Sequence, residues 1–336
     1  QLNDIGVIHD KINLLTNKIS IFEDLNYFFN LRRKIKKIKP DIIIAYTIKP
    51  VVYTGLNILF FRNKIIFIPM ITGVGHYFNV KRFREKLIKL LVINLLKISF
   101  YKVSKVIFQN KDNIQTFIKY KIISSKKISL VEGSGVDVRK FKNIKKYKKI
   151  KKKSNSVTFL LMARLQIDKG IIEFLKAADL VKVVFPKTRF LIIGDKDVSN
   201  NAVDIKLVEN YEKRGVIEYF GFISDVRNFI SMADVFVLPS YHEGLPRSSL
   251  EAMSMEKPIL TTNVAGCKET VINGKNGFKV TVKDVNSLYK KMLWFINNVS
   301  KFNEMGKESR EIVLNRFSTD IINKKLKKII SDHIND

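Results

Sequence analysis

The chain has 336 residues, of which 46% are hydrophobic and 11% aromatic, so its composition is that of a globular protein long enough for two domains. Its single cysteine, Cys267, excludes an intramolecular disulfide and is compatible with a reducing cytoplasm. No apolar run reaches the roughly 20 residues that a membrane-spanning helix needs. Composition therefore favours a cytoplasmic protein without a transmembrane helix.

The net charge of +30 is distributed unevenly along the chain. Residues 1–153 contain 34 Lys and Arg against 9 Asp and Glu, a net of 34 − 9 = +25, whereas the remainder contains 27 against 22, a net of 27 − 22 = +5. The first half is therefore expected to meet an anionic partner, either an anionic membrane surface on which the protein lies peripherally or an anionic acceptor. Nucleic acid is the rival partner. The sequence contains no helix-turn-helix, zinc-finger or RNP-type signature, so we expect no nucleic acid.

The first half alternates between apolar strands and helices. Strands are expected in residues 6–10, 41–47, 64–73 and 105–110, and again after Lys127. Helices are expected over residues 19–40, which Pro40 ends, over 54–63, and over a long segment with basic residues at Lys81, Arg82, Arg84, Lys86 and Lys89. The apolar part of that segment, residues 87–100, is interpreted as an ordinary amphipathic helix. This alternation predicts a parallel, doubly wound α/β sheet.

Residues 142–156 are rich in lysine and lack apolar periodicity, which is typical of a solvated linker. Beyond them the alternation resumes. Strands are expected at the start of 156–170 and over 188–195, 216–223, 234–240, 257–264 and 277–281. Helices are expected over 171–184, 225–232, around Glu251 and over 287–299. The second half therefore predicts a second doubly wound domain.

The stretch from Pro239 to Gly277 contains most of the functional information. The apolar strand ends at Pro239, a short turn follows, and Pro246 stands where the first turn of a helix tolerates proline. The open amides of that helix, together with the positive end of its dipole, suit an anion. Glu243 and Glu251 bracket the turn, and eight helical steps between them span roughly 12 Å. One ligand with hydroxyls at both ends and phosphates between them could touch both carboxylates.

Two cations, Arg164 and Lys169, are expected on the turn after the first strand of the second domain. Parallel sheets bind ligands at this carboxyl edge, where the two charges could neutralise a diphosphate. On these residues alone, a pair of exposed surface cations is an equally good interpretation. For the glutamates the alternative is a helix-capping or solvent-exposed carboxylate.

The segment PSYHEGLPRSSLEAMSMEKPIL resembles the Glu-seven-residues-Glu signature of retaining family 4 glycosyltransferases, which use nucleotide sugars and have the GT-B fold. ARLQIDKG resembles the Arg-Leu-x-x-x-Lys-Gly turn of the same family. The resemblance implies two Rossmann-like domains that face a cleft. The acceptor-side domain would occupy residues 1–150 and lack its first βαβ unit. The donor-binding domain, with a C-terminal helix, would occupy 151–336. Glu256 departs from the family pattern, which commonly has glycine there.

The resemblance also implies roles for individual residues. Glu243 would contact the transferred sugar, Glu251 the ribose hydroxyls, and Arg164 and Lys169 the diphosphate. Gly244, Leu245 and Pro246 would shape the turn over the phosphates, and Gly221 and Phe222 would lie beside the nucleobase. His76 is the candidate for the histidine that this family often has near the donor sugar, although an alignment through Gly73 puts Thr72 at that position. No cofactor or metal is expected, because the histidines and the cysteine show no ligand spacing.

The sequence therefore indicates a retaining glycosyltransferase. It would move a hexose or N-acetylhexosamine from a nucleotide diphosphate sugar, with UDP favoured, to a lipid-linked or polysaccharide acceptor in cell-surface glycan synthesis. The alternative is a non-catalytic basic protein that uses the fold to bind an anionic membrane or nucleic acid, which would have no need of Arg164, Lys169, Glu243 and Glu251 together. A nucleotide-sugar epimerase is disfavoured by the spacing of the two glutamates.

Overall fold

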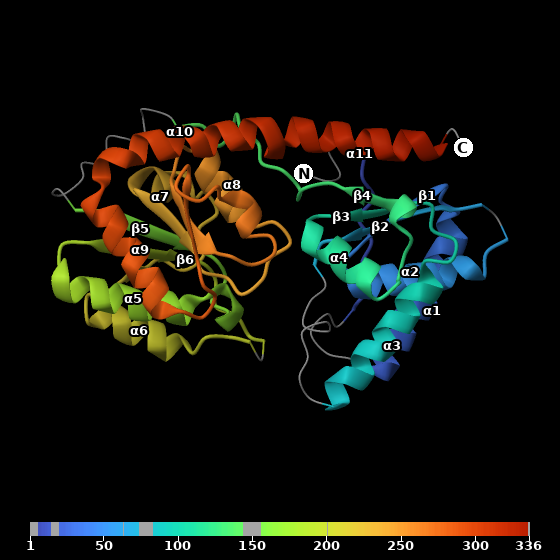
Figure 1. Ribbon diagram of the computed structural model, residues 1–336. Coiled ribbons are helices and arrows are strands. Elements are labelled where there is room, and N and C mark those ends of the chain that lie inside the picture. Colours follow the sequence, from blue (N-terminus) through green and yellow to red (C-terminus); the bar gives the residue numbers. More distant parts are fainter. Residues whose placement is uncertain are drawn as a thin grey trace. The chain divides into compact units, whose positions relative to one another are not determined.

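The computed structural model describes residues 6–14, 20–62, 64–73, 83–143, 156–199 and 201–334. These residues form two compact units (Figure 1). Unit 1 comprises Gln1–Phe108, Asp112–Leu130 and Ile330–Asp336, and unit 2 comprises Gln109–Lys111 and Val131–Ile329. The predicted boundary between residues 150 and 151 lies outside the described residues, as does most of the predicted linker.

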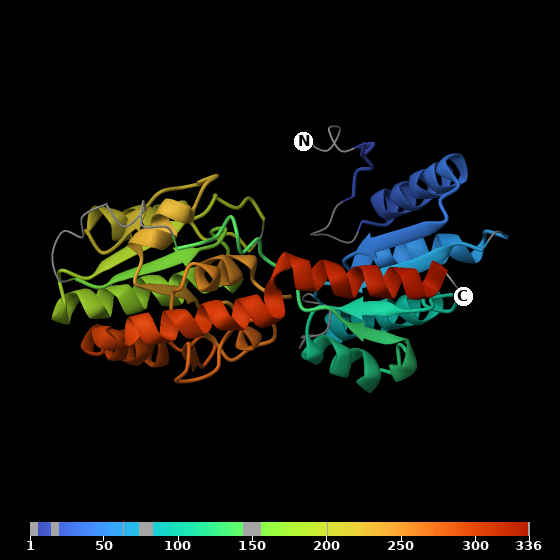
Figure 2. The same cartoon turned by 90° about the horizontal axis from the view of Figure 1, so that it is seen from above.

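Unit 1 contains a four-stranded parallel sheet in the order β1-β2-β3-β4. The strands are β1 (Ile42–Tyr46), β2 (Ile66–Ile71), β3 (Val106–Phe108) and β4 (Ile128–Leu130). The helices are α1 (Ile21–Ile38), α2 (Ile48–Leu59), α3 (Phe83–Ser99) and α4 (Lys111–Lys119). Figure 1 shows α2 and α3 below the sheet, and the strands lie over them in the view from above (Figure 2).

Two expectations for unit 1 are corrected. The strand predicted over residues 6–10 is wrong, because this segment pairs with no strand in the described part of the chain and leaves Val7 and Ile8 exposed. Helix α2 begins at Ile48 rather than near Thr54. Pro50 falls in its first turn, where the missing N–H of a proline leaves no helical hydrogen bond unmade.

Unit 2 contains a six-stranded parallel sheet in the order β10-β9-β8-β5-β6-β7. The strands are β5 (Thr158–Met162), β6 (Arg189–Ile193), β7 (Glu218–Tyr219), β8 (Val235–Leu238), β9 (Ile259–Thr262) and β10 (Gly277–Val280). The helices that cover the sheet include α5 (Ile171–Val184), α6 (Ile205–Lys213), α7 (Arg227–Met232), α8 (Arg247–Ser254) and α9 (Val285–Asn297). Figure 1 shows α5 and α6 on one side of the sheet and α7 and α8 on the other.

Strand β5 is the centre of this sheet and is buried on both faces. Phe159 and Leu161 pack into one hydrophobic cluster with α5 and α9, whereas Leu160 and Met162 pack into a second cluster with α8. A strand that is covered on both faces has a continuous apolar sequence, which is why this strand was predictable. β5 pairs with β6 on one side and with β8 on the other, so the strand order reverses at β5. Doubly wound sheets bind their ligands at the carboxyl ends of the strands at such a reversal.

The C-terminal segment of unit 2 is helical. Helix α10 (Phe302–Ile312), a π-helical turn (Val313–Phe317) and helix α11 (Thr319–Ile334) follow one another. Arg310 of α10 binds the segment that leads out of β4. Its guanidinium donates to the carbonyls of Val138 at 3.0 Å and Phe141 at 2.8 Å, and to Ser254 of α8. One side chain thus holds three separate stretches of the chain together.

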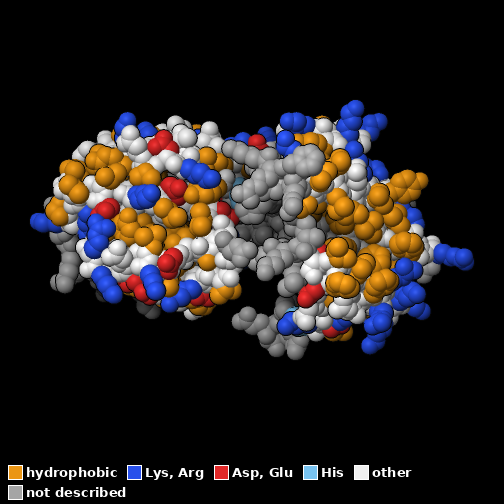
Figure 3. Space-filling model, turned by 90° about the horizontal axis from the view of Figure 1, so that it is seen from below, with side chains coloured by type: hydrophobic (Ala, Val, Ile, Leu, Met, Phe, Trp, Pro, Cys, Tyr) orange, Lys and Arg blue, Asp and Glu red, His pale blue; other side chains and the backbone are white. Residues whose placement is uncertain are grey.

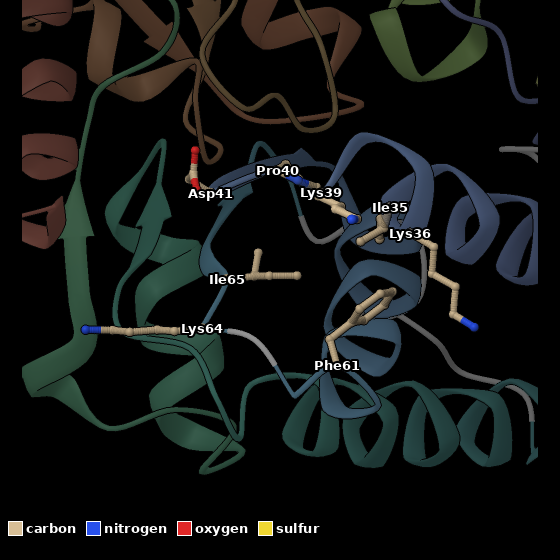
Figure 4. A pocket seen from close by; sticks show the side chains of 8 residues that line it. All are labelled: Ile35, Lys36, Lys39, Pro40, Asp41, Phe61, Lys64 and Ile65. Carbon is tan, nitrogen blue, oxygen red and sulfur yellow. The ribbon is translucent and has the colours of Figure 1, made fainter.

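A cavity of about 270 Å³ lies at the amino-terminal edge of the unit 1 sheet, in front of β1 and β2. In Figure 4 the side chains of Phe61 and Ile65 point into it, whereas those of Lys36 and Lys64 extend away. Its lining is therefore mixed, partly apolar and partly charged. This is the edge opposite to the carboxyl ends of the strands, where sheets of this type bind their substrates.

We predict that Arg310→Met destabilises unit 2, because it leaves several partly buried acceptors without a donor. A hydrogen bond to a charged group contributes about 1.5–3 kcal/mol, so a loss of at least that size is expected in urea unfolding. Lys307→Met, at an exposed position on the same helix, is the control and should change stability by less than about 0.5 kcal/mol. An equal loss of stability from the two substitutions would contradict a stabilising role for the hydrogen bonds of Arg310.

Candidate active site

The candidate site lies where β5 and β8 end side by side. The turn after β5 contains Arg164 and a 3-10 turn, Ile167–Lys169, and Gly170 then starts α5. Gly170 has φ +71°, and a Cβ at this position would lie 2.2 Å from the carbonyl oxygen of Pro239 at the end of β8. Only glycine therefore allows the turn after β5 to pack directly on the end of β8. This contact brings Lys169 beside the loop that contains Glu243.

Lys169 and Glu243 form an ion pair in which Lys169 Nζ lies 2.8 Å from Glu243 Oε1. The same oxygen accepts a hydrogen bond of 3.0 Å from the hydroxyl of Ser240, which is fully buried. The side chains of Lys169 and Glu243 are 19% and 16% exposed. The pair is therefore largely shielded from solvent and yet still reachable by a ligand.

The backbone of Glu243 is fixed by the loop after β9. Its N–H donates to the carbonyl of Ala265 at 3.0 Å. Gly266, with φ +80°, approaches so closely that a Cβ would lie 2.4 Å from the carbonyl oxygen of Glu243. Glu243 is thus held by β5, β8 and β9 together, which restricts the position of its carboxylate.

Helix α8 begins directly after this loop. Pro246 is its N-terminal cap and provides no side-chain hydrogen bond to the first turn, and Leu250 N–H makes the first bond back to the Pro246 carbonyl. The N–H groups of residues 247–249 consequently have no partner within the helix. A helix start with open amides is therefore present where it was predicted, and such amides suit an anion. Gly244 and Leu245 form the turn before it, and Leu245 packs against Gly133.

Glu251 lies within α8, with 14% of its side chain exposed. Burial raises the pKa of its carboxyl group, and the hydrogen bond of 3.2 Å from Arg247 Nε to Glu251 Oε1 opposes this effect in part. Arg247 is itself exposed. A buried carboxylate with one exposed partner is poorly compensated, and it gains from further hydrogen-bond donors such as sugar hydroxyls.

Arg164 does not contact Glu243 in this structure. Its guanidinium lies 3.2 Å from Asp197 Oδ2 in the loop after β6, and Gln166 donates to the same oxygen at 2.7 Å. The pKa of Asp197 is lowered mainly by its hydrogen bond with Ser199, with Gln166 and Arg164 contributing less. Arg164 remains largely exposed at the turn after β5, where a second anionic group could approach it.

The predicted nucleobase loop follows β7. Gly221 has φ +63°, and its carbonyl accepts a hydrogen bond of 2.8 Å from Gly194 N–H at the end of β6. The Phe222 side chain is 71% exposed, which leaves its ring available to a flat partner. His76 lies outside the described residues. Glu243 and Lys169 are thus brought into contact, whereas no direct contact joins them to Phe222 or Arg164.

Sequence reasoning missed several residues that support the site. Ser240 binds Glu243, and its position in the Pro-Ser pair before the turn was the available signal. Asp168 accepts the Tyr241 N–H at its carbonyl, at 2.7 Å, and its carboxylate lies 3.8 Å from His242. The sequence alone offers no signal for Asp168 or His242. Both lie next to the Lys169–Glu243 pair in the sequence and help to join the two turns.

The described residues contain no group of three or more His, Cys, Asp and Glu side chains arranged to hold a metal ion. Cys267 is buried behind the site, and burial raises the pKa of its thiol to about 12. The thiol is therefore protonated at neutral pH and does not act as a nucleophile.

Comparison with known proteins places this geometry in a family. The profile of the family described as glycosyl transferases group 1 matches residues 142–312. The chain is 26% identical over 301 residues to N,N'-diacetylbacillosaminyl-diphospho-undecaprenol alpha-1,3-N-acetylgalactosaminyltransferase of Campylobacter jejuni, covering 87% of this chain and 77% of the relative. It is 28% identical over 313 residues to an Escherichia coli UDP-Gal:alpha-D-GlcNAc-diphosphoundecaprenol alpha-1,3-galactosyltransferase, covering 90% and 78%.

Solved structures agree on the fold. Anabaena Alr3699/HepE in complex with UDP-glucose superposes with a TM-score of 0.78 at 19% identity, covering 95% of this chain and 85% of that one. The structural neighbours are GT-B glycosyltransferases, which confirms the predicted fold class of two α/β domains with parallel sheets.

We predict that Gly170→Ala disrupts the site through the contact with Pro239. Gly215→Ala is the control, since Gly215 also has a positive φ, +70°, but has open space around its missing Cβ. The control should lose about 1–2 kcal/mol of stability from the left-handed conformation alone. Gly170→Ala should lose clearly more in urea unfolding, because backbone atoms must also move apart. Similar losses in both variants would show that the close packing is unimportant.

The raised pKa of Glu251 predicts a pH dependence of stability. The folded protein binds this proton more tightly than the unfolded chain, so the contribution of Glu251 to stability falls as pH rises from the ordinary glutamate range through the raised pKa. Glu251→Gln should therefore raise the melting temperature at pH 7, with the difference shrinking towards pH 4. Glu209→Gln, at an exposed position on α6, is the control. A lower melting temperature for Glu251→Gln at pH 7 would contradict the assignment.

Proposed function

This chain belongs to the glycosyl transferases group 1 family and is a glycosyltransferase, and from that premise we propose that it transfers a hexose or N-acetylhexosamine from a UDP-linked donor to a lipid-linked acceptor. We further propose that the anomeric configuration of the sugar is retained. The product would be an intermediate of a cell-surface glycan such as a capsule or O-antigen. The names of the relatives support both substrates, since one relative acts from UDP-Gal and both act on undecaprenol diphosphate-linked sugars.

The Lys169–Glu243 ion pair beside the open N-terminus of α8 is the observation that carries this proposal. Both hydrogen bonds to the Glu243 carboxylate end on Oε1, which leaves Oε2 to accept from hydroxyls of the transferred sugar. Lys169 donates one of its three ammonium N–H groups to Glu243, and its other two N–H groups can donate to a phosphate. One cluster can therefore hold the sugar and the adjoining phosphate at the same time.

The remaining roles follow the shape of a nucleotide sugar. The diphosphate would accept hydrogen bonds from the first amides of α8 and would be neutralised by Lys169 and Arg164. Glu251, about one turn further along the helix, would accept from the ribose hydroxyls, and Gly221 and Phe222 would flank the base. In the transfer step, the acceptor hydroxyl would arrive on the side from which the diphosphate leaves, and its proton would pass to the leaving phosphate oxygen. Positive groups aimed at that developing charge lower the barrier.

This proposal needs no metal ion. Phosphoryl leaving groups are often neutralised by a divalent cation, but Lys169, Arg164 and the amides of α8 supply positive character at the same place. Turnover that persists in the presence of a chelator would support it.

The acceptor would lie at an anionic membrane, where the basic first half of the chain is expected to dock. The described part of the chain contains no helix with the length and hydropathy needed to cross a bilayer. We propose that the enzyme works as a peripheral protein at the cytoplasmic face and binds no nucleic acid.

Substitution of the two glutamates tests the roles separately. Glu243→Ala should abolish transfer while leaving the affinity for free UDP close to that of the wild type, because the diphosphate and ribose contacts remain. Glu251→Ala should weaken UDP binding itself by about ten- to a hundredfold, since a charge-assisted hydrogen bond contributes about 1.5–3 kcal/mol. Calorimetry with UDP and GDP gives the affinities, and released nucleotide from a panel of nucleotide sugars gives the turnover.

Wild-type UDP affinity in both variants would overturn these roles. Tighter binding of GDP than of UDP would exclude the proposed base, and NMR of an inverted product would exclude retention. Glu209→Ala on the surface of α6 controls for the loss of a carboxylate and should change neither quantity.

A further inference from the structure

Helix α3 of unit 1 is apolar on two opposite faces. Its inner face is buried against the rest of the unit through Val92, Ile93 and Leu96. Its outer face contains Leu87, Leu90, Leu91 and Ile98, whose exposed fractions are 54%, 56%, 57% and 50%. These positions fall on one side of a helix with 3.6 residues per turn, and only Asn94 among the residues between them on that side is polar. The sequence had suggested an ordinary amphipathic helix, but an ordinary amphipathic helix is polar on its outer face.

We call Leu87, Leu90, Leu91 and Ile98 the α3 stripe. It extends over eleven helical steps, from Leu87 to Ile98, or roughly 17 Å at the rise of an α-helix. Lys86 and Lys97 lie along its edge and are exposed. Figure 3, which views the molecule from the side on which α3 lies in Figure 1, shows hydrophobic side chains gathered over unit 1 and Lys and Arg around their rim. A contiguous apolar surface with a charged rim is typical of an interaction site.

The charge of unit 1 identifies the partner. Residues 1–130 contain 24 Lys and Arg against 7 Asp and Glu, a net of 24 − 7 = +17. On α1, the buried Asp24 is paired with Lys49 at 2.9 Å, so its carboxylate does not offset the exposed cations Arg33, Lys36 and Lys37. A second copy of this chain would bring two strongly positive surfaces together and is disfavoured. Nucleic acid would satisfy the cations but would leave the four apolar side chains in water.

We propose that the α3 stripe inserts into the interfacial layer of an anionic bilayer, with Lys86 and Lys97 on the lipid headgroups. Interfacial helices bury their apolar face about 5–10 Å below the headgroups, and nearby cations contribute about 1 kcal/mol each at an anionic surface. Salt therefore weakens the electrostatic contribution to the binding free energy and leaves the contribution of apolar burial intact. This inference deepens the proposed function, whose acceptor lies in a membrane, but its test measures docking rather than transfer, so either can fail alone.

The test compares two triple variants. Leu87, Leu90 and Leu91 are changed to Ser in one. In the control, Leu180, Val183 and Val184 on α5 of unit 2, which are 46%, 82% and 56% exposed, are changed to Ser. Sedimentation with vesicles that contain phosphatidylglycerol should show binding at least about tenfold weaker for the α3 variant and unchanged for the control. Both variants should keep the wild-type melting temperature and UDP affinity, which shows that they are folded.

Insertion itself is measured with a fluorophore that reports polarity. Because Cys267 is buried, Leu90→Cys and Val183→Cys can each be labelled selectively at the new thiol. Emission from the Leu90 position should shift to the blue on phosphatidylglycerol vesicles and be quenched by spin-labelled acyl chains, whereas emission from the Val183 position should do neither. Unchanged emission at Leu90 in vesicle-bound protein overturns the proposal. Equal binding to pure phosphatidylcholine vesicles would also overturn it. The same holds if the protein forms a dimer in lipid-free solution and the α3 substitutions abolish that dimer.

Discussion

The contact between Gly170 and the carbonyl of Pro239 determines the geometry of the candidate site in unit 2. It allows the turn after β5 to lie directly on the end of β8. Lys169 thereby reaches Glu243, which is 74 residues away in sequence. Gly266 makes a second contact of the same kind from β9. Two residues without side chains thus place the two charged side chains to which we assign the chemistry in our proposal.

Much of this arrangement could be predicted from the sequence, because strands buried on both faces have an unmistakable composition. β5 and α5 lie where they were expected, and so does the start of α8. The failures have physical reasons too. The segment around Val7 and Ile8 is apolar enough for a strand but has no neighbour to pair with. In the run predicted as a strand over 216–223, only Val216 and Ile217 are buried, and only Glu218–Tyr219 pairs with the edge of the sheet.

Contacts between distant residues could not be predicted from a single sequence. Arg164 pairs with Asp197, and Arg310 joins its own helix to residues 138–141 and to Ser254. Both sets of contacts depend on how loops meet in space. Glu256, which had departed from the family pattern without explanation, is now interpretable. It adopts φ +59°, a left-handed conformation that costs a non-glycine residue roughly 1–2 kcal/mol and in which glycine is preferred. Its carboxylate accepts a hydrogen bond of 2.7 Å from Asn143, which offsets part of that cost.

At the candidate site, too, a local energetic cost is partly offset by other interactions. Glu251 is mostly buried with a raised pKa, and the Lys169–Glu243 ion pair is largely shielded from water. Each arrangement is unfavourable for the isolated protein, since charge is removed from water without full compensation. Each becomes favourable when hydroxyls and phosphates fill the site, because a shielded charge interacts more strongly with its ligand than an exposed one. The α3 stripe follows this rule with apolar surface in place of charge. We therefore expect the donor to bind where charged groups are shielded from water, and the membrane to bind where apolar side chains are exposed to it.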